Sequence, residues 1–121
     1  MKKNGNETNA SWYFYEKLYF KGRIDDKERI ISALLEGGKL PRVYVVSLSD
    51  NKDSLFEIYE CSNPLIPLLV KEKAYIIAIC RGHSNLLEFI RELFDTHQND
   101  IFDFKNYWEK QSFLPKEKLS L

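Results

Sequence analysis

The first thing this 121-residue sequence lacks is an excess of either charge. It has 18 Lys and Arg residues against 18 Asp and Glu residues, so the formal net charge is zero. Proteins that bind nucleic-acid duplexes usually carry a basic excess, because counterion release from phosphates supplies much of their affinity. No run of Lys or Arg is longer than two residues. We therefore expect no nucleic acid among the partners.

Long apolar runs are also missing. A membrane-spanning helix needs roughly 20 consecutive apolar residues, and the runs in this sequence are far shorter. The first ten residues, MKKNGNETNA, lack the apolar core of a secretory signal. The sequence thus predicts a cytoplasmic protein without membrane segments, in which Cys61 and Cys80 are free thiols.

Motifs of known chemistry are absent as well. Neither glycine-rich phosphate-binding pattern is present, and neither histidine lies in a nucleophile-elbow motif. Cys80 and His83 have a C-x-x-H spacing, but Cys61 and His97 do not form the second close pair that a zinc site usually shows. We therefore expect no metal and no cofactor, and a binding role in preference to an enzymatic one.

The residues that are present are sufficient for one folded domain. Apolar residues make up 44% of the sequence and charged residues 30%, which is the profile of an ordinary soluble globular protein. We expect a single domain over residues 1–121, with flexible ends at 1–9 and 112–121.

Two helices are predicted near the N-terminus. Residues 11–22, SWYFYEKLYFKG, are rich in aromatic side chains that do not alternate with polar ones, which favours a helix over a strand. The next helix starts at Asp25, where Glu28 completes a capping-box spacing, and it ends at Gly37.

The middle of the sequence predicts strands. Residues 42–49 and 54–61 indicate a β-hairpin around a turn at 50–53. Residues 65–70 contain Pro67, which favours a buried loop or a single helical turn. Residues 74–80 are apolar on both faces, so we expect a strand that is covered on both sides.

Two further helices complete the predicted order ααβββαα. One is capped by Ser84 or Asn85, and the other spans residues 101–110. The predicted fold is an α+β two-layer sandwich, in which N- and C-terminal helices pack on a mixed or antiparallel sheet of about three strands. Such a sheet has two edges, and the strand at 74–80 has neither Lys nor Pro to protect an edge, so we predict a homodimer.

The segment Cys80–Ser84, CRGHS, is the strongest local candidate for a site, and we call it the junction. A helix N-terminus beside Arg81, with Gly82 allowing close backbone approach, could bind an anion through Arg81, Gly82, His83 and Ser84. The positive potential of the helix N-terminus and of Arg81 would also lower the pKa of Cys80, and His83 could act as a base. The alternative is a plain strand-to-helix turn with a buried cysteine.

The aromatic residues near the N-terminus are the second candidate. Trp12, Tyr13, Tyr15 and Tyr19 could be core residues or the anchors of a protein interface. The sequence therefore predicts a small binding domain that acts through protein–protein contacts, including contacts with a second copy of itself. The alternative is a protein that binds a small molecule or an anion, or a minor enzyme, at the junction.

Overall fold

The computed structural model describes residues 11–35, 40–49, 54–61, 73–96 and 101–115. These residues form an α+β fold with one five-stranded mixed sheet, in the order β3-β2-β4-β1-β5. Along the chain the elements are β1 (Ser11–Lys21), η1 (Ile24–Asp26), α1 (Lys27–Leu35), β2 (Val43–Leu48), β3 (Phe56–Glu60), β4 (Lys73–Arg81), α3 (His83–Thr96), α4 (Ile101–Glu109) and β5 (Phe113–Pro115). The predicted class is confirmed, but the predicted order ααβββαα is wrong: the observed order of α-helices and strands is βαβββααβ.

The segment at residues 11–22 is the main correction, because it forms strand β1 and not a helix. Trp12 and Phe14 are buried on one face of the sheet, and Tyr15 is buried on the other. A strand that is covered on both faces has no reason to alternate apolar with polar residues. The absence of alternation between apolar and polar residues is therefore consistent with an inner strand. The high β-propensity of aromatic residues was a signal for a strand in the sequence itself.

The central strand of the sheet is β4. It pairs with β1 in parallel and with β2 in antiparallel orientation. The predicted hairpin is confirmed by the antiparallel pairing of β2 with β3. Because β4 has a neighbour on each side, the edge that suggested a dimer through residues 74–80 does not exist. The predicted turn at 50–53 and the Pro67 segment lie outside the described residues.

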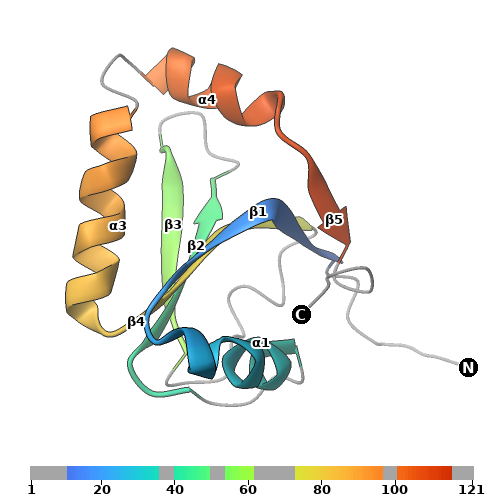
Figure 1. Ribbon diagram of the computed structural model, residues 1–121. Helices are drawn as coiled ribbons and strands as arrows, with labels where there is room; N and C mark the ends of the chain where they lie inside the picture. The colour runs from blue at the N-terminus through green and yellow to red at the C-terminus, as the bar shows by residue number, and fades with distance from the viewer. Residues whose placement is uncertain (1–10, 36–39, 50–53, 62–72, 97–100, 116–121) are drawn as a thin grey trace, which may run out of the picture.

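Helices cover both faces of the sheet, so the predicted two-layer sandwich is wrong in this detail. Helix α1 packs through Ile30 and Ile31 on one face, with Trp12, Phe14, Val43, Val45, Ile76 and Ile79. Helices α3 and α4 pack on the other, with Tyr15, Val46, Ile77, Leu86, Phe89, Leu93, Phe104 and Trp108. Figure 1 shows α3 and α4 on one side of the diagonal strands β1 and β4, and α1 on the other. The predicted burial of β4 on both faces is confirmed.

Helix α3 begins earlier than its predicted cap. The Leu86 N–H donates to the Gly82 carbonyl at 3.2 Å, so Gly82 precedes the first helical residue. Ser84 and Asn85, the predicted caps, therefore lie within the first turn. The Asn85 side-chain amide instead donates to the Arg81 carbonyl at 2.7 Å, which ties the start of α3 to the end of β4.

The C-terminal part of the described chain adds one strand to the sheet. Helix α4 is where the sequence predicted it, and Phe113–Pro115 then pair antiparallel with β1, within the end expected to be flexible. Among the described residues, no helix combines the length and the apolar character needed to cross a membrane.

Candidate functional site

The junction lies at the end of β4, where the chain turns into α3. The Arg81 guanidinium donates to the Asp26 carboxylate at 3.2 Å, and Arg29 donates to the same carboxylate at 2.8 Å. The hydrogen bond from Arg29 lowers the pKa of Asp26 below its usual value, and the charge of Arg81 adds to this effect. An anion at the junction would therefore have to compete with Asp26 for Arg81.

The other predicted ligand residues of the junction are on its surface. Gly82 has a φ of 89°, a left-handed conformation that suits glycine. His83 and Ser84 are exposed in the first turn of α3, and the His83 ring lies 6.2 Å from that of Tyr44. The structure thus brings the predicted residues together in a turn, but none of them lines the pocket described below.

Cys80 has the opposite electrostatic environment from the one that a nucleophile needs. Its side chain is fully buried, and burial raises the pKa of the thiol to about 12. The pKa of Cys61 is raised to about 12 for the same reason. A thiol in this state is protonated at neutral pH and is a poor nucleophile or metal ligand. Among the described residues, no three His, Cys, Asp or Glu side chains are grouped to hold a metal ion.

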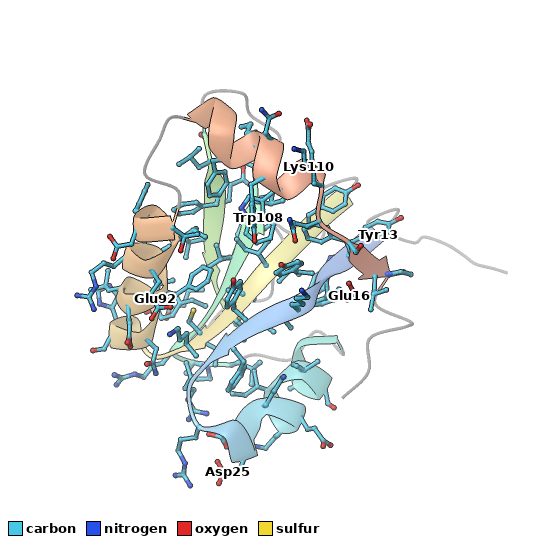
Figure 2. The ribbon with its side chains drawn as sticks, turned by 45° about the horizontal axis from the view of Figure 1, so that its top comes forward. Tyr13, Glu16, Asp25, Glu92, Trp108 and Lys110 are labelled. Atoms are coloured by element: carbon cyan, nitrogen blue, oxygen red, sulfur yellow. The ribbon has the colours of Figure 1, made fainter. Side chains whose placement is uncertain are left out.

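A pocket of about 650 Å³ lies at the opposite end of the sheet, and we call it the aromatic pocket. It is formed by the beginnings of β1 and β4, the end of β2, the residue just before β3, helix α4 and strand β5. Its lining consists of Tyr13, Leu48, Ser49, Leu55, Tyr75, Phe104, Lys105, Trp108, Glu109, Gln111 and Phe113. Figure 2 shows Trp108 between α4 and the strands, and Tyr13 at the beginning of β1 near β5.

Stacked rings form one wall of the pocket. Tyr13 and Tyr75 are direct partners in the parallel pairing of β1 with β4, and their rings stack with centroids 5.3 Å apart and planes 20° apart. The Phe113 ring meets Tyr75 edge-on, also at 5.3 Å. Parallel strands place paired side chains on the same face at the same level, so this pairing holds the two tyrosines in register.

Buried rings form the base of the pocket. Trp108 is only 4% exposed, and Tyr15 meets it edge-on with centroids 4.9 Å apart. The Tyr15 hydroxyl donates to Gln111 Oε1 at 3.0 Å, and Gln111 Nε2 donates to the Tyr107 carbonyl at 3.2 Å. Burial raises the pKa of Tyr15 to about 12, with a further contribution from the Tyr107 side chain. These bonds attach the end of α4 to β1 and keep the base in place.

Polar groups lie at the rim of the pocket. Ser49, Lys105, Glu109 and Gln111 are the polar side chains of the lining. Lys105 and Glu109 carry opposite charges and are four residues apart on α4, so the two charged side chains of the described lining balance each other. No His or Cys is among the lining residues.

The four predicted interface residues lie in the core, at the pocket and on the surface. Trp12 and Tyr15 are buried on opposite faces of the sheet. Tyr13 lines the aromatic pocket. Tyr19 is 41% exposed, and its ring lies 5.4 Å from that of Phe89 on α3. Only Tyr13 and Tyr19 therefore present surface that a partner could reach without opening the core.

Sequence reasoning missed most of the pocket, including Tyr75, Phe113 and the residues around the β2–β3 connection. One signal was available: aromatic residues are concentrated at both ends of the sequence, and the structure brings these two ends together beside β4. No protein-family model, curated protein or solved structure matches this chain.

Proposed function

We propose that this chain is a small binding protein of the cytoplasm, and that its ligand is a flat, ring-bearing molecule without net charge, held in the aromatic pocket. One observation supports the proposal most strongly: a pocket of about 650 Å³ has a stacked tyrosine pair as one wall and buried Trp108 at its base. This volume lies within the roughly 300–1,000 Å³ range of small-molecule sites. Two free thiols, Cys61 and Cys80, are in keeping with a reducing compartment.

The lining selects for rings and against charge. Aromatic side chains bind planar ligands through offset-stacked and edge-on contacts, both of which already occur among Tyr13, Tyr75 and Phe113. The Lys105 and Glu109 charges cancel at the rim, so they give a charged ligand no net attraction. Among the described residues, the Tyr13 and Tyr75 hydroxyls have no hydrogen-bond partner, and they are available to a carbonyl or hydroxyl group of the ligand.

Binding is favoured over catalysis because of the residues that face the pocket. A reactive site would need a nucleophile or an acid–base pair with a shifted pKa. Cys80 and His83 are at the other end of β4, and neither lines the pocket. The rings and aliphatic side chains that make up most of the described lining are suited to hold a planar molecule.

The experiment compares two tyrosines on the same face of the sheet. Tyr75 lines the pocket, whereas Tyr44 lies beside His83 at the junction end, and both are half-buried. The dissociation constant of the neutral fluorescent probe N-phenyl-1-naphthylamine should rise at least tenfold in Tyr75→Leu and stay unchanged in Tyr44→Leu. A panel of neutral ring compounds is then ranked by displacement of the probe and by thermal shift.

A second variant controls for loss of folding. Leu55→Trp places a larger side chain at the pocket wall without removing any of the stacked rings, so the fold should persist while probe binding weakens. Both variants are checked for wild-type circular dichroism before titration. Equal probe affinity in wild type, Tyr75→Leu and Leu55→Trp would refute the proposal.

A further inference from the structure

The two edges of the sheet differ in how they are protected. At one edge, β5 has only three residues and ends in Pro115, which has no N–H to donate. At the other edge, β3 has five residues, FEIYE, with neither Pro nor Lys. The backbone groups of an edge strand can pair with another chain, and the only charged residues that β3 sets against this are Glu57 and Glu60. Strand β3 is therefore the edge at which the described sheet can be extended.

Hydrogen bonds at the two ends of the hairpin show which backbone groups of β3 point outward. The Cys61 N–H donates to the Val43 carbonyl at 2.8 Å, and the Ser49 N–H donates to the Leu55 carbonyl at 3.3 Å. In an antiparallel ladder the groups of alternate residues face the same neighbour. The observed register therefore directs residues 55, 57, 59 and 61 toward β2. The N–H and C=O groups of Phe56, Ile58 and Glu60 point away from the sheet.

The surface beside this edge is apolar. Ile58 is 42% exposed, and it is paired with Val46, whose side chain packs on the α3 side of the sheet. Phe56 lies on the same face and meets Phe94 of α3, with ring centroids 6.1 Å apart. Ile58 and the α3 surface around Phe94 thus lie on one side of the molecule, as Figure 1 shows for β3 and α3.

The exposed apolar residues of α3 lie on its β3-facing flank. Leu87 is 55% exposed and Phe94 is 49% exposed, and their spacing of seven residues places them on one line of the helix. On the opposite flank, Glu92 accepts a hydrogen bond from Lys21 of β1 at 2.8 Å. The β3-facing flank and Ile58 together account for three of the five large apolar side chains that are exposed in the described part of the chain.

We propose that a second copy of this chain covers this surface, with the two β3 strands pairing antiparallel about a two-fold axis at Ile58. The pairing would join two five-stranded sheets into one and place the β3-facing flanks of both α3 helices beside the axis. This inference concerns a different surface from the aromatic pocket and does not depend on it.

The positions of the two glutamates restrict the register in which two copies of β3 can pair. Centring the axis on Ile58 places Glu60 opposite Phe56 and Glu57 opposite Tyr59, so no glutamate faces a glutamate. Registers centred on Glu57 or Glu60 would place like charges opposite each other, which destabilises a sheet. Within one chain the Tyr59 hydroxyl already donates to Glu57 Oε1 at 2.7 Å. The same pair of groups would meet again across the axis, where non-hydrogen-bonded partners bring their side chains close.

The first experiment measures mass by analytical ultracentrifugation across micromolar concentrations. One chain has a mass of 14.3 kDa, and the wild type should approach twice this value as its concentration rises. Ile58→Lys should remain at the mass of one chain, because it places two ammonium groups at the axis. Leu87→Lys should weaken association less. Tyr107→Lys is the control, because Tyr107 is also exposed but lies on α4 near Tyr19, and it should leave association unchanged.

The second experiment tests the register. Residues opposite each other in a hydrogen-bonded pair have Cα atoms about 5.5 Å apart, within the range that a disulfide can span. Oxidised Ile58→Cys should therefore form a covalent dimer. Glu60→Cys should not, because its counterpart would lie about 14 Å away along the strand. A wild-type mass equal to one chain at all concentrations would overturn the proposal, as would cross-linking of Glu60→Cys in preference to Ile58→Cys.

Discussion

At the end of the sheet where β4 enters α3, two arginines share one carboxylate: Asp26 accepts from both Arg29 and Arg81. At the other end, aromatic side chains from four elements enclose a pocket of about 650 Å³. The polar residues of the junction do not line the described pocket, and the pocket end has space without a recognisable motif. The comparison shows that residues adjacent in sequence need not enclose a cavity, whereas residues far apart in sequence can.

The largest expected effect comes from removing the base of the pocket. Trp108→Ala should lower the free energy of unfolding by about 3–5 kcal/mol, because it leaves a cavity beneath α4 that the surrounding rings cannot fill. His83→Ala, at the exposed junction, should change it by less than about 0.5 kcal/mol. Urea denaturation of both variants measures the comparison. Similar losses in the two variants would mean that the ends of the sheet do not differ as described.

Substitutions of two glycines, with the next largest expected effects, test the packing at the junction end. A Cβ at Gly22 would lie 2.9 Å from the Arg81 Cβ, and the φ of Gly22 is 155°. Gly22→Ala should therefore cost about 2–3 kcal/mol, from backbone strain together with displacement of the end of β4. A Cβ at Gly82 would meet nothing within 4 Å, so Gly82→Ala, with a φ of 89°, should cost about 1 kcal/mol from its left-handed backbone alone. Thermal denaturation ranks the two, and a larger loss in Gly82→Ala would contradict the packing at this end.

Tyr15→Phe should have a smaller effect, which depends on pH. Losing the hydrogen bond to Gln111 should cost about 1 kcal/mol at neutral pH. The folded pKa of Tyr15 is raised from 10.0 to about 12, so the unfolded chain releases this proton first as the pH rises. Stability should therefore fall between pH 10 and pH 12, and Tyr15→Phe should lose less stability over that interval. Denaturation midpoints measured across this range test the effect, and equal slopes in both proteins would contradict it.

The smallest expected effect is at Asp26. Its pKa is lowered from 3.8, so its contribution to stability is present above that value and is lost as the pH falls through the lower, folded pKa. Asp26→Asn should leave the thermal midpoint at neutral pH almost unchanged, because the ion pairs are partly exposed. It should flatten the decline of the midpoint below about pH 4. A large loss at neutral pH would mean that the junction contributes more to stability than its exposure allows.

Much of the fold could be predicted because its signals are local. Apolar stripes marked α1 and α3, and a run of β-branched residues marked β2. The predicted starts at Asp25 and at Ser84 or Asn85 were wrong, because α1 begins at Lys27 and α3 at His83. Strand β1 was misread because it is apolar on both faces, and its polar residues Glu16 and Lys17 fall where its register with β4 shifts, between Phe14 and Tyr19. A three-residue strand such as β5 has no periodicity to detect.

The pocket could not be predicted, for a related reason. Its wall requires Tyr13 and Tyr75 to be partners in parallel strands, which cannot be inferred while residues 11–22 are taken for a helix. Its base requires α4 and β5 to return to the same strands. The junction drew attention because its five residues are consecutive, yet the structure shows that the charge of Arg81 is already paired with Asp26.

The central claim is that ligands bind at the pocket end and not at the junction. Chemical-shift mapping by nuclear magnetic resonance tests it most directly, with neutral 2-naphthol and inorganic phosphate added separately to ¹⁵N-labelled protein. We predict that 2-naphthol shifts the amide signals of Tyr13, Tyr75 and Gln111, and that phosphate leaves those of Arg81–Ser84 in place. Shifts that gather at Arg81–Ser84, with the pocket residues unmoved, would contradict the account.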